Sequence, residues 1–490
     1  MWLKSPRIVT AAALAVALAS LSLAPPSSIL ASRSTTSPSP GSWSRLSKAQ
    51  ESTTAAMLRT SNGHNLIAWQ VHPRLKFSYD LAELSPTGGL AVGTKDIFAG
   101  HDWTGNSGTP VLLMDGGKPL IVFSGQESLS GKYSNGCVVG ALRSGSTWVL
   151  QPWTLSLGCT FANVGFGGAT ITKTGVLSAD WGGGTLNYRV GASPSIPATT
   201  PDKEIKTSGD TEFTSEVDDI SGNGDVYGGW DQFFSRPASA DGVYIEDLSK
   251  GSGEKHAPDS GTSTTSHPTE ALAMASPSSR PGVFVAYCSN SSKCTRIDLW
   301  KYGAAKPMAV PKSSGGQMVA LSAGADGRLW LAWFAPATAR VSTVRTNKAA
   351  TAFGPVESYP VPAGCATDGN ATVGISSGSA QRLDVAVICY DYNASGSGTH
   401  ISVTQSEAGL AISPPVAFIS HKRGGSVTYH VLDAGDAVPG ATVVVDERSG
   451  KTNGNGAITF KFPKGARVGI FKAIASMSDY YSATGSLKVG

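Results

Sequence analysis

The stretch VLLMDGGKPLIVFSG (111–125) has an apolar run, a glycine-containing turn and a second apolar run. Two short apolar runs joined in this way are typical of an antiparallel β-hairpin. The pattern returns about every 50 residues, a spacing within the range of repeat architectures. The further copies are ATITKTGVLSADWGG (169–183), DDISGNGDVYGGWDQ (218–232), LAMASPSSRPGVFVAYCSN (272–290), VALSAGADGRLWLAWFAP (319–336) and VGISSGSAQRLDVAVICYD (373–391).

A second, weaker pair of strands follows most of these hairpins, for example CVVGALRSGSTWVLQPW at 137–153. Four short strands per repeat, with turn signals and no helical period, predict the blades of a β-propeller. We expect an all-β chain with a six-bladed propeller over residues 61–420. Residues 61–108 are expected to supply the closing strand of the last blade. LAELSPTGGLAVG (81–93) also resembles a hairpin, so a seventh blade stays open as an alternative.

The N-terminal residues have the pattern of an export signal. Lys4 and Arg7 precede the apolar run AAALAVALASLSLA (11–24), and small polar residues follow it. We expect a signal peptide at 1–32 and a Ser/Thr/Pro-rich linker at 33–60. The alternative is a retained anchor, but the run is Ala-rich and shorter than the ~20 strongly apolar residues of a span. The expected location is secreted or extracellular, free or attached to the cell surface, with no membrane span after cleavage.

Composition and net charge limit the classes of partner that we expect for the chain. A net charge of +4 on 490 residues, without a basic stripe, gives no reason to expect a nucleic-acid partner. Only 15% of the residues are charged and 58 are glycine, which favours an extracellular all-β protein. We expect a monomer without a cofactor.

The six cysteines fall as neighbours in the sequence. We expect the disulfides Cys137–Cys159, Cys288–Cys294 and Cys365–Cys389, which is one choice among several connectivities. CSNSSKC (288–294) could join two adjacent strands across a short loop. Disulfides persist in oxidising compartments, in agreement with export. The alternative, metal binding, has neither a CxxC motif nor a histidine cluster to support it.

The C-terminal segment has a different pattern, with alternating strands in ATVVVDE and AITFKF and an Asn-Gly turn at Asn453 or Asn455. Pro439-Gly440-Ala441-Thr442-Val443 and Gly450-Lys451-Thr452 through Gly456 resemble the recurring pattern of bacterial Ig-like and carboxypeptidase-regulatory-like modules. The resemblance implies a small β-sandwich at 421–490 that spaces or attaches other domains.

ALRSGSTWVL (141–150) contains Gly145, Thr147 and Trp148 in a Gly-x-Thr-Trp pattern. This resembles the Asp box, Ser-x-Asp-x-Gly-x-Thr-Trp, which lies between the third and fourth strands of sialidase-like blades. Ala141 and Arg143 depart from the box. Region 61–420 thus resembles the sialidase-like, BNR-repeat propeller superfamily. The box is a folding motif, so it carries no implication of activity.

Catalysis of the sialidase type would require an arginine triad, a Tyr nucleophile with its Glu, and an Asp acid/base. Tyr188-Arg189-Val190-Gly191 lacks the proline of the family's first arginine motif, and no Tyr–Glu pair can be assigned. The weak catalytic candidates are Asp102 and Asp231, which lie close to tryptophans, and Arg236. The alternative for each aspartate is a loop residue that caps a turn.

The spacing Asp219-x-Ser221-x-Asn223-Gly224-Asp225 is similar to that of a calcium loop. Asp219, Asn223 and Asp225 are therefore weak candidates for cation ligands. The same position is a hairpin turn in the other repeats, so a plain turn is the favoured interpretation.

The second strand of each hairpin carries a large ring near its end. These rings are Phe123, Trp181, Trp230, Tyr287, Trp333 and Tyr390. Trp181, Trp230, Tyr287, Trp333 and Tyr390 are candidates for stacking on sugars. In the alternative, the rings fill the wedge between blades.

The sequence as a whole favours a binding protein over an enzyme. The expected partner is a glycan or another extracellular polymer, recognised without catalysis. The alternative is an exo-acting glycoside hydrolase of the sialidase type.

Overall fold

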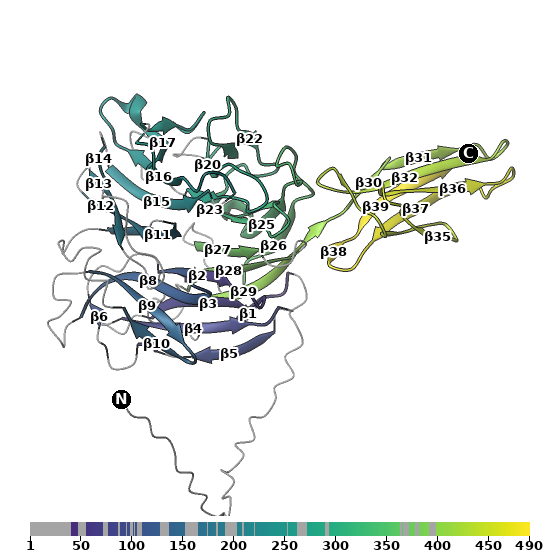
Figure 1. The fold of residues 1–490 in the computed structure, drawn as a ribbon. Coiled ribbons are helices and arrows are strands. Elements are labelled where there is room, and N and C mark those ends of the chain that lie inside the picture. The colour runs from purple at the N-terminus through teal and green to yellow at the C-terminus, as the bar shows by residue number, and fades with distance from the viewer. Residues whose placement is uncertain are drawn as a thin grey trace, which may run out of the picture. The chain divides into compact units, whose positions relative to one another are not determined.

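A computed structural model divides the chain into two compact units, residues 1–36 and 37–490. The residues that it describes lie in the second unit and are 41–47, 55–71, 77–86, 89–94, 96–98, 101, 103–104, 110–127, 137–151, 165–173, 175–182, 185–191, 203–207, 210–219, 221–251, 253–261, 272–289, 294–362, 365, 372–377, 382–391 and 398–490. Their regular elements are β-strands and two 3-10 helices, η2 (Ala238–Ala240) and η3 (Pro336–Thr338) (Figure 1). Within these ranges no helix has the length and hydropathy that crossing a bilayer requires.

Seven antiparallel sheets of four main strands each follow one another through the described part of residues 44–409. The first three are β2 (Ala55–Arg59), β3 (Asn65–Val71), β4 (Ser78–Leu84), β5 (Leu90–Thr94); β7 (Val111–Asp115), β8 (Lys118–Glu127), β9 (Cys137–Ser144), β10 (Thr147–Leu150), with the short β6 (Trp103–Thr104) beside β8; and β11 (Gly165–Thr172), β12 (Gly175–Gly182), β13 (Thr185–Gly191), β14 (Lys203–Lys206).

The next four sheets have the same organisation. They are β15 (Asp210–Asp218), β16 (Val226–Phe233), β17 (Gly242–Asp247), β18 (Lys255–His256); β19 (Ala273–Ala275), β20 (Phe284–Cys288), β21 (Ile297–Lys301), β22 (Met308–Ala309); β23 (Gln317–Ala323), β24 (Leu329–Ala335), β25 (Arg340–Arg345), β26 (Glu357–Pro360); and β27 (Thr372–Ser377), β28 (Arg382–Asp391), β29 (Gly398–Gly409), β1 (Ser44–Arg45).

The six predicted hairpins are confirmed as the first two strands of the second to seventh sheets. The β2–β5 sheet is additional to the six expected units. Residues 61–108 therefore do not provide the closing strand that we expected from them. That strand is β1, in which Ser44 pairs with Val403. Both β1 and β2 lie in the segment 33–60 that the sequence predicted as a linker.

Successive sheets contact one another in a closed order. The first strand of each sheet contacts the first strand of the next, and β27 contacts β2. Each neighbouring pair also shares a buried apolar cluster, and Ile67 and Trp69 of the first sheet pack with Ile388 and Val403 of the seventh. Middle strands such as LWLAWFA of β24 are apolar on both faces because both faces are covered. This organisation is consistent with a β-propeller.

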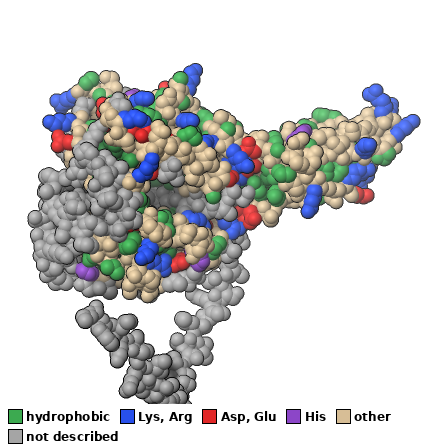
Figure 2. All heavy atoms as spheres, in the orientation of Figure 1, with side chains coloured by type: hydrophobic (Ala, Val, Ile, Leu, Met, Phe, Trp, Pro, Cys, Tyr) green, Lys and Arg blue, Asp and Glu red, His purple; other side chains and the backbone are tan. Residues whose placement is uncertain are grey.

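Residues 411–489 form two further sheets, which we call the C-terminal module. One holds β30 (Ala411–Ser413), β32 (Gly425–Asp433), β33 (Asp436–Ala437) and β36 (Ala457–Phe462); the other holds β31 (Val416–Ile419), β39 (Ala483–Val489), β37 (Gly469–Ser476), β34 (Thr442–Val445) and β35 (Arg448–Lys451). Both sheets contribute to one buried cluster. Figure 2 shows Lys and Arg side chains gathered at the end of this module on the right of the view.

A buried ionic contact joins the module to the sixth sheet within the same compact unit. Arg345 of β25 forms an ion pair with Asp433 of β32, and both side chains are 2% exposed. Arg328 reaches Asp436 over 2.6 Å. The short strand β38 (Tyr480–Tyr481) pairs in parallel with the end of β29.

Candidate functional site

The segment ALRSGSTWVL occupies the expected turn, between the third and fourth strands of its sheet. Ser144 pairs with Thr147 at the end of the β9–β10 ladder, and Gly145 has a φ of 62° that favours glycine in this turn. The Thr147 hydroxyl donates to the Ser144 carbonyl over 2.9 Å. Trp148 packs against the apolar cluster shared by the first two sheets. The three residues that match the box pattern therefore have local folding roles.

Arg143, which stands in place of the box aspartate, has a different role. Its guanidinium extends to the neighbouring sheet and contacts the Glu83 carboxylate over 3.1 Å. The second oxygen of Glu83 lies 2.9 Å from His64 Nδ1. Glu83 thus lies between the guanidinium of Arg143 on β9 and the imidazole of His64 in the β2–β3 turn.

A recess of about 500 Å³ opens at this point between the first and second sheets. We call it the turn recess. It is lined by Thr60, Ser61 and Asn62 of the β2–β3 turn, by Glu83, by Met114, Gly117, Lys118 and Pro119 of the β7–β8 hairpin, and by Arg143, Ser144 and Gly145. Its volume is within the range of about 300–1,000 Å³ that small-molecule sites occupy.

A layer of polar contacts fixes the first wall of the turn recess. Arg59 donates to the Gly63 carbonyl over 2.8 Å and pairs with the buried Asp384 over 2.5 Å. Asn65 donates to the same carboxylate over 3.1 Å. Because Asp384 belongs to β28, the turn that carries Asn62 is anchored to the seventh sheet as well as to its own.

The lining of the turn recess is rich in hydrogen-bonding groups. Hydroxyl, amide, guanidinium and ammonium groups can exchange hydrogen bonds with a ligand rich in hydroxyls. Most glycoside hydrolases use two carboxyl groups that flank the scissile bond, whereas sialidases use a Tyr nucleophile. Among the described lining residues Glu83 is the only carboxylate, and Arg143 and His64 both contact it.

The structure describes two of the three catalytic candidates, and these two differ in exposure. Asp231 of β16 is 2% exposed, whereas Arg236 is an exposed residue of the following turn. Gln232 and the buried Asp241 hold that turn, since Asp241 accepts the Ser235 amide over 2.7 Å. Asp102 lies outside the described residues.

Three of the candidate stacking rings are in the interior. Trp230 and Trp333 are 0% exposed and Tyr287 is 1% exposed. The Tyr287 hydroxyl donates to the Pro258 carbonyl over 2.6 Å, and Trp230 stacks on Tyr244. Their burial agrees with the alternative that such rings fill the space between sheets. The side chains of Trp181 and Tyr390 lie outside the described part of the chain.

Protein donors contact the three candidate residues of the cation loop, Asp219, Asn223 and Asp225. Asp219 accepts the Ser276 hydroxyl and the Gly282 amide, both over 3.0 Å. Asp225 pairs with Lys250, and its hydrogen bond raises the pKa of that ammonium. The Asn223 carbonyl accepts Lys173 Nζ. The arrangement favours a turn that ties neighbouring sheets over a cation site.

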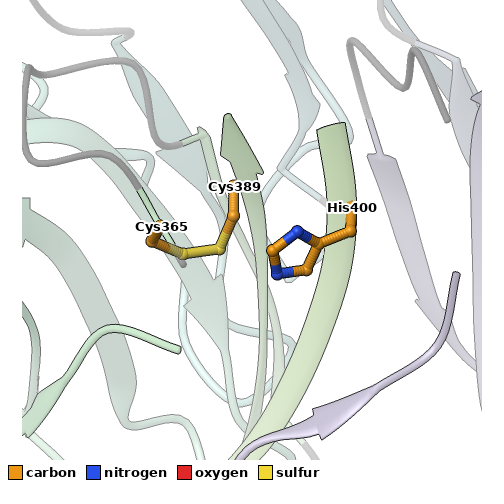
Figure 3. A group of neighbouring side chains, drawn as sticks. All are labelled: Cys365, Cys389 and His400. Atoms are coloured by element: carbon orange, nitrogen blue, oxygen red, sulfur yellow. A yellow bond between two sulfur atoms is a disulfide. The ribbon is translucent and has the colours of Figure 1, made fainter. Parts of the chain in front are cut away.

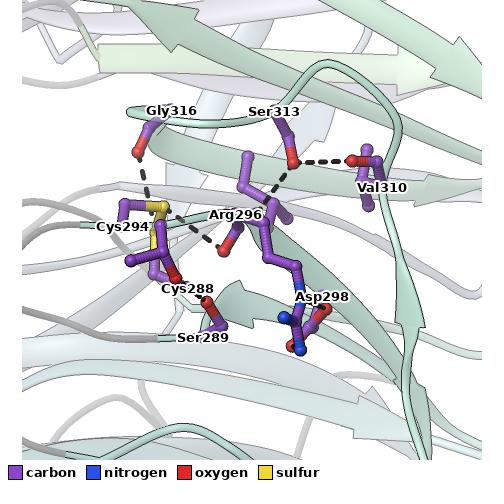
Figure 4. Close-up of a disulfide and its surroundings, with 10 residues drawn as sticks. Cys288, Ser289, Cys294, Arg296, Asp298, Val310, Ser313 and Gly316 are labelled. Carbon is purple, nitrogen blue, oxygen red and sulfur yellow. Dashed lines mark hydrogen bonds and ion pairs between the residues drawn. A yellow bond between two sulfur atoms is a disulfide. The ribbon is translucent and has the colours of Figure 1, made fainter.

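Two of the predicted disulfides, Cys288–Cys294 and Cys365–Cys389, are confirmed. The first closes the β20–β21 loop beside Ser289, Arg296 and Gly316 (Figure 4). The second lies beside the buried His400, whose ring nitrogen is within 4.8 Å of both sulfurs (Figure 3). Sulfurs bonded to each other are not thiolates, so this group is not a metal site in the disulfide form. Cys159 and the Cys137 side chain lie outside the described residues.

The turn recess was not predicted from the sequence. Its walls come mainly from turns of two sheets. The β2–β3 turn among them is anchored through Arg59 to Asp384, which is more than 300 positions away. One signal was available, namely a charged Arg143 at a position where the family pattern has the opposite charge.

No family model and no curated protein sequence matches the chain. Solved structures do match. A Dyadobacter fermentans protein of unknown function is 12% identical over 75% of this chain and 100% of its own, with a TM-score of 0.39. The NanB sialidase of Streptococcus pneumoniae is 9% identical over 74% and 69%, with a TM-score of 0.40. Sqt1 of Chaetomium thermophilum is 9% identical over 76% and 98%, with a TM-score of 0.43. At these values the matches say nothing about the site or activity of this chain.

Proposed function

We propose that the chain is an exported, non-catalytic binding protein with a seven-bladed β-propeller of the sialidase-like kind. In this proposal the turn recess binds a hydroxyl-rich ligand, a glycan or another extracellular polymer. The C-terminal module is an Ig-like sandwich attached to the propeller. The two disulfides and the N-terminal sequence pattern support an extracellular location.

One observation carries the choice of binding over hydrolysis. The turn recess has several hydrogen-bonding groups but, within its described lining, a single carboxylate, whose two oxygens lie 3.1 Å from Arg143 and 2.9 Å from His64 Nδ1. A ligand hydroxyl can accept from Arg143 or Asn62 and donate to Glu83 without any proton transfer. Met114 and Pro119 add a small apolar wall against which the carbon face of a sugar can pack.

The experiment that separates binding from hydrolysis uses the wild-type chain in two assays. A glycan array that includes anionic and neutral polysaccharides measures binding, and a fluorogenic sialoside measures hydrolysis. We expect retention of at least one glycan class and no release of fluorophore above the uncatalysed rate. Enzymatic release would establish the hydrolase alternative, and an array without any retained glycan would remove the proposed ligand class.

A further inference from the structure

Exposed apolar side chains concentrate in the C-terminal module. Eight large hydrophobic residues of the described chain are exposed, and six of them lie there: Val416, Phe418, Val444, Val468, Ile470 and Met477. Phe418 and Ile470 are 70% exposed and Val468 is 60% exposed. Single exposed apolar residues are normal, but a group of them indicates an interaction site.

Sheet register places the most exposed of these residues side by side. Phe418 of β31 and Ile470 of β37 are the cross-strand neighbours of Lys488 on β39, which lies between them. Ala417 and Leu487, the alternate residues, are buried in the module's core. Phe418 and Ile470 therefore lie on the outer face of the sheet. With Val468 and Lys488 they line a recess of about 490 Å³.

The turns next to this recess carry further cations. Lys422 and Arg423 lie in the β31–β32 turn, and Lys464 lies in the turn after β36. The two turns contact each other, since the Gly465 amide donates to the His421 carbonyl over 2.8 Å. We call Phe418, Val468, Ile470, Lys422, Lys464 and Lys488 the apolar–basic end.

The positive charge of this end is not compensated within the module. Residues 411–490 contain nine Lys and Arg and five Asp and Glu. Four of the five acids form ion pairs with arginines, namely Asp433, Asp436, Asp446 and Asp479. Lys422, Arg423, Lys464, Lys472 and Lys488 are exposed, and no acid within the described residues pairs with them.

These features select one kind of occupant. A second copy of the chain would bring like charges together, and residues 1–40 contain Lys4, Arg7 and Arg33 but no acid. An anionic polysaccharide would match the charge and could stack on the Phe418 ring, but it has no apolar layer to take up the aliphatic side chains of Val468 and Ile470. An anionic bilayer satisfies both requirements, because its headgroups attract lysines while its interface accepts apolar side chains. We propose that the apolar–basic end docks on anionic lipid bilayers.

The test measures co-sedimentation of the full chain with vesicles. Vesicles of phosphatidylcholine with phosphatidylglycerol are compared with vesicles of phosphatidylcholine alone, at low and high salt. We expect binding to the anionic vesicles to be at least about tenfold stronger, and to weaken at high salt. The N-terminal apolar run is the same in every variant, so differences between variants report on the module.

Two variants alter the end and two serve as controls. Phe418→Ser combined with Ile470→Ser removes the apolar contact, and Lys422→Glu combined with Lys488→Glu reverses the charge. Val149→Ser and Lys306→Glu make comparable changes at exposed positions elsewhere. We expect the first two variants to bind anionic vesicles about tenfold more weakly or worse, and the controls to bind as the wild type does. Circular dichroism verifies that each variant is folded.

Three outcomes would overturn the proposal. They are equal binding to both kinds of vesicle, anionic-vesicle binding that the Phe418/Ile470 variant retains, and self-association of the wild type that this variant abolishes. The glycan array of the preceding subsection uses a different ligand and site, so failure of one proposal leaves the other intact.

Discussion

Arg143 and Glu83 form an ion pair of 3.1 Å between two neighbouring sheets, although they are 60 positions apart in the sequence. The other oxygen of Glu83 lies 2.9 Å from Nδ1 of His64. One carboxylate therefore joins the β2–β3 turn, which carries His64, to the end of β9, which carries Arg143. The β9–β10 turn, whose sequence resembles the Asp box, therefore has two roles. It closes the hairpin locally, and it forms a wall of the turn recess.

Replacing Arg143 by aspartate, the residue of the Asp-box pattern at this position, should destabilise the protein. Arg143→Asp would replace an attractive pair by two facing carboxylates. The side chains are 25% and 15% exposed, so screening limits the loss in unfolding free energy to about 1 kcal/mol. Urea unfolding measures it. Arg143→Gln is the control and should lose about half as much; an Asp variant as stable as the wild type would contradict the role of the pair.

The ion pair between Arg345 and Asp433 should contribute far more to the free energy of unfolding than the pair between Arg143 and Glu83. Both side chains are 2% exposed, and the guanidinium also lies over the Trp330 ring. Asp433→Ala leaves a buried cation without its carboxylate, a change that typically costs about 3–5 kcal/mol. Calorimetry should show a lower melting temperature or a separate transition for the C-terminal module.

Asp479→Ala provides the matched control for this prediction. Asp479 is 56% exposed and lies 3.6 Å from Arg382, so its removal should change the unfolding free energy by no more than about 0.5 kcal/mol. Equal effects of the two variants would show that burial of the Arg345–Asp433 pair is unimportant.

The two disulfides should differ in their effect on stability. Cys365–Cys389 spans 24 positions and Cys288–Cys294 spans 6. A longer closed loop restricts the unfolded chain more, so the Cys365→Ser/Cys389→Ser variant should lose about 1 kcal/mol more than the Cys288→Ser/Cys294→Ser variant. Guanidinium unfolding of both pairs without reductant measures the difference, and the reverse order would contradict the prediction.

Alkaline pH should weaken the fold, in part through Tyr227. Burial, followed by the nearby Asp247, raises the pKa of its phenol to about 12. The unfolded chain releases this proton near pH 10, whereas the folded chain holds it until about pH 12. Stability from this group is therefore complete below pH 10 and is lost as the pH rises through that window. Tyr227→Phe should show a smaller fall in unfolding free energy between pH 9 and pH 12 than the wild type; identical slopes would refute the assignment.

Local pattern was sufficient for the hairpins. VLLMDGGKPLIVFSG became β7 and β8 because two apolar runs and a Gly116–Gly117 turn, both with positive φ, specify a hairpin without distant contacts. The turn of ALRSGSTWVL was also correctly placed between the third and fourth strands. The strands of the C-terminal module followed from alternation, as in ATVVVDE, where Val443 and Val445 are buried and Val444 between them is exposed.

The remaining features depend on distant residues. The additional sheet begins at Ala55, inside a stretch whose composition resembles a linker, and the sequence pattern indicated only its last two strands, in 81–93. The partner of β1 is more than 350 residues away, so no local pattern could identify the closing strand. The turn recess likewise requires Glu83 and Arg143 to meet across two sheets.

The binding role of the turn recess is tested most directly by titrating the wild-type chain and recess variants with the glycan class retained on the array. We predict that Asn62→Ala and Glu83→Gln each weaken binding at least about tenfold, as the loss of a hydrogen bond to a charged or amide group would. Val149→Ser, on β10 but outside the recess, should bind as the wild type does. If both recess variants are folded and bind the glycan as strongly as the wild type does, the turn recess is not the binding site.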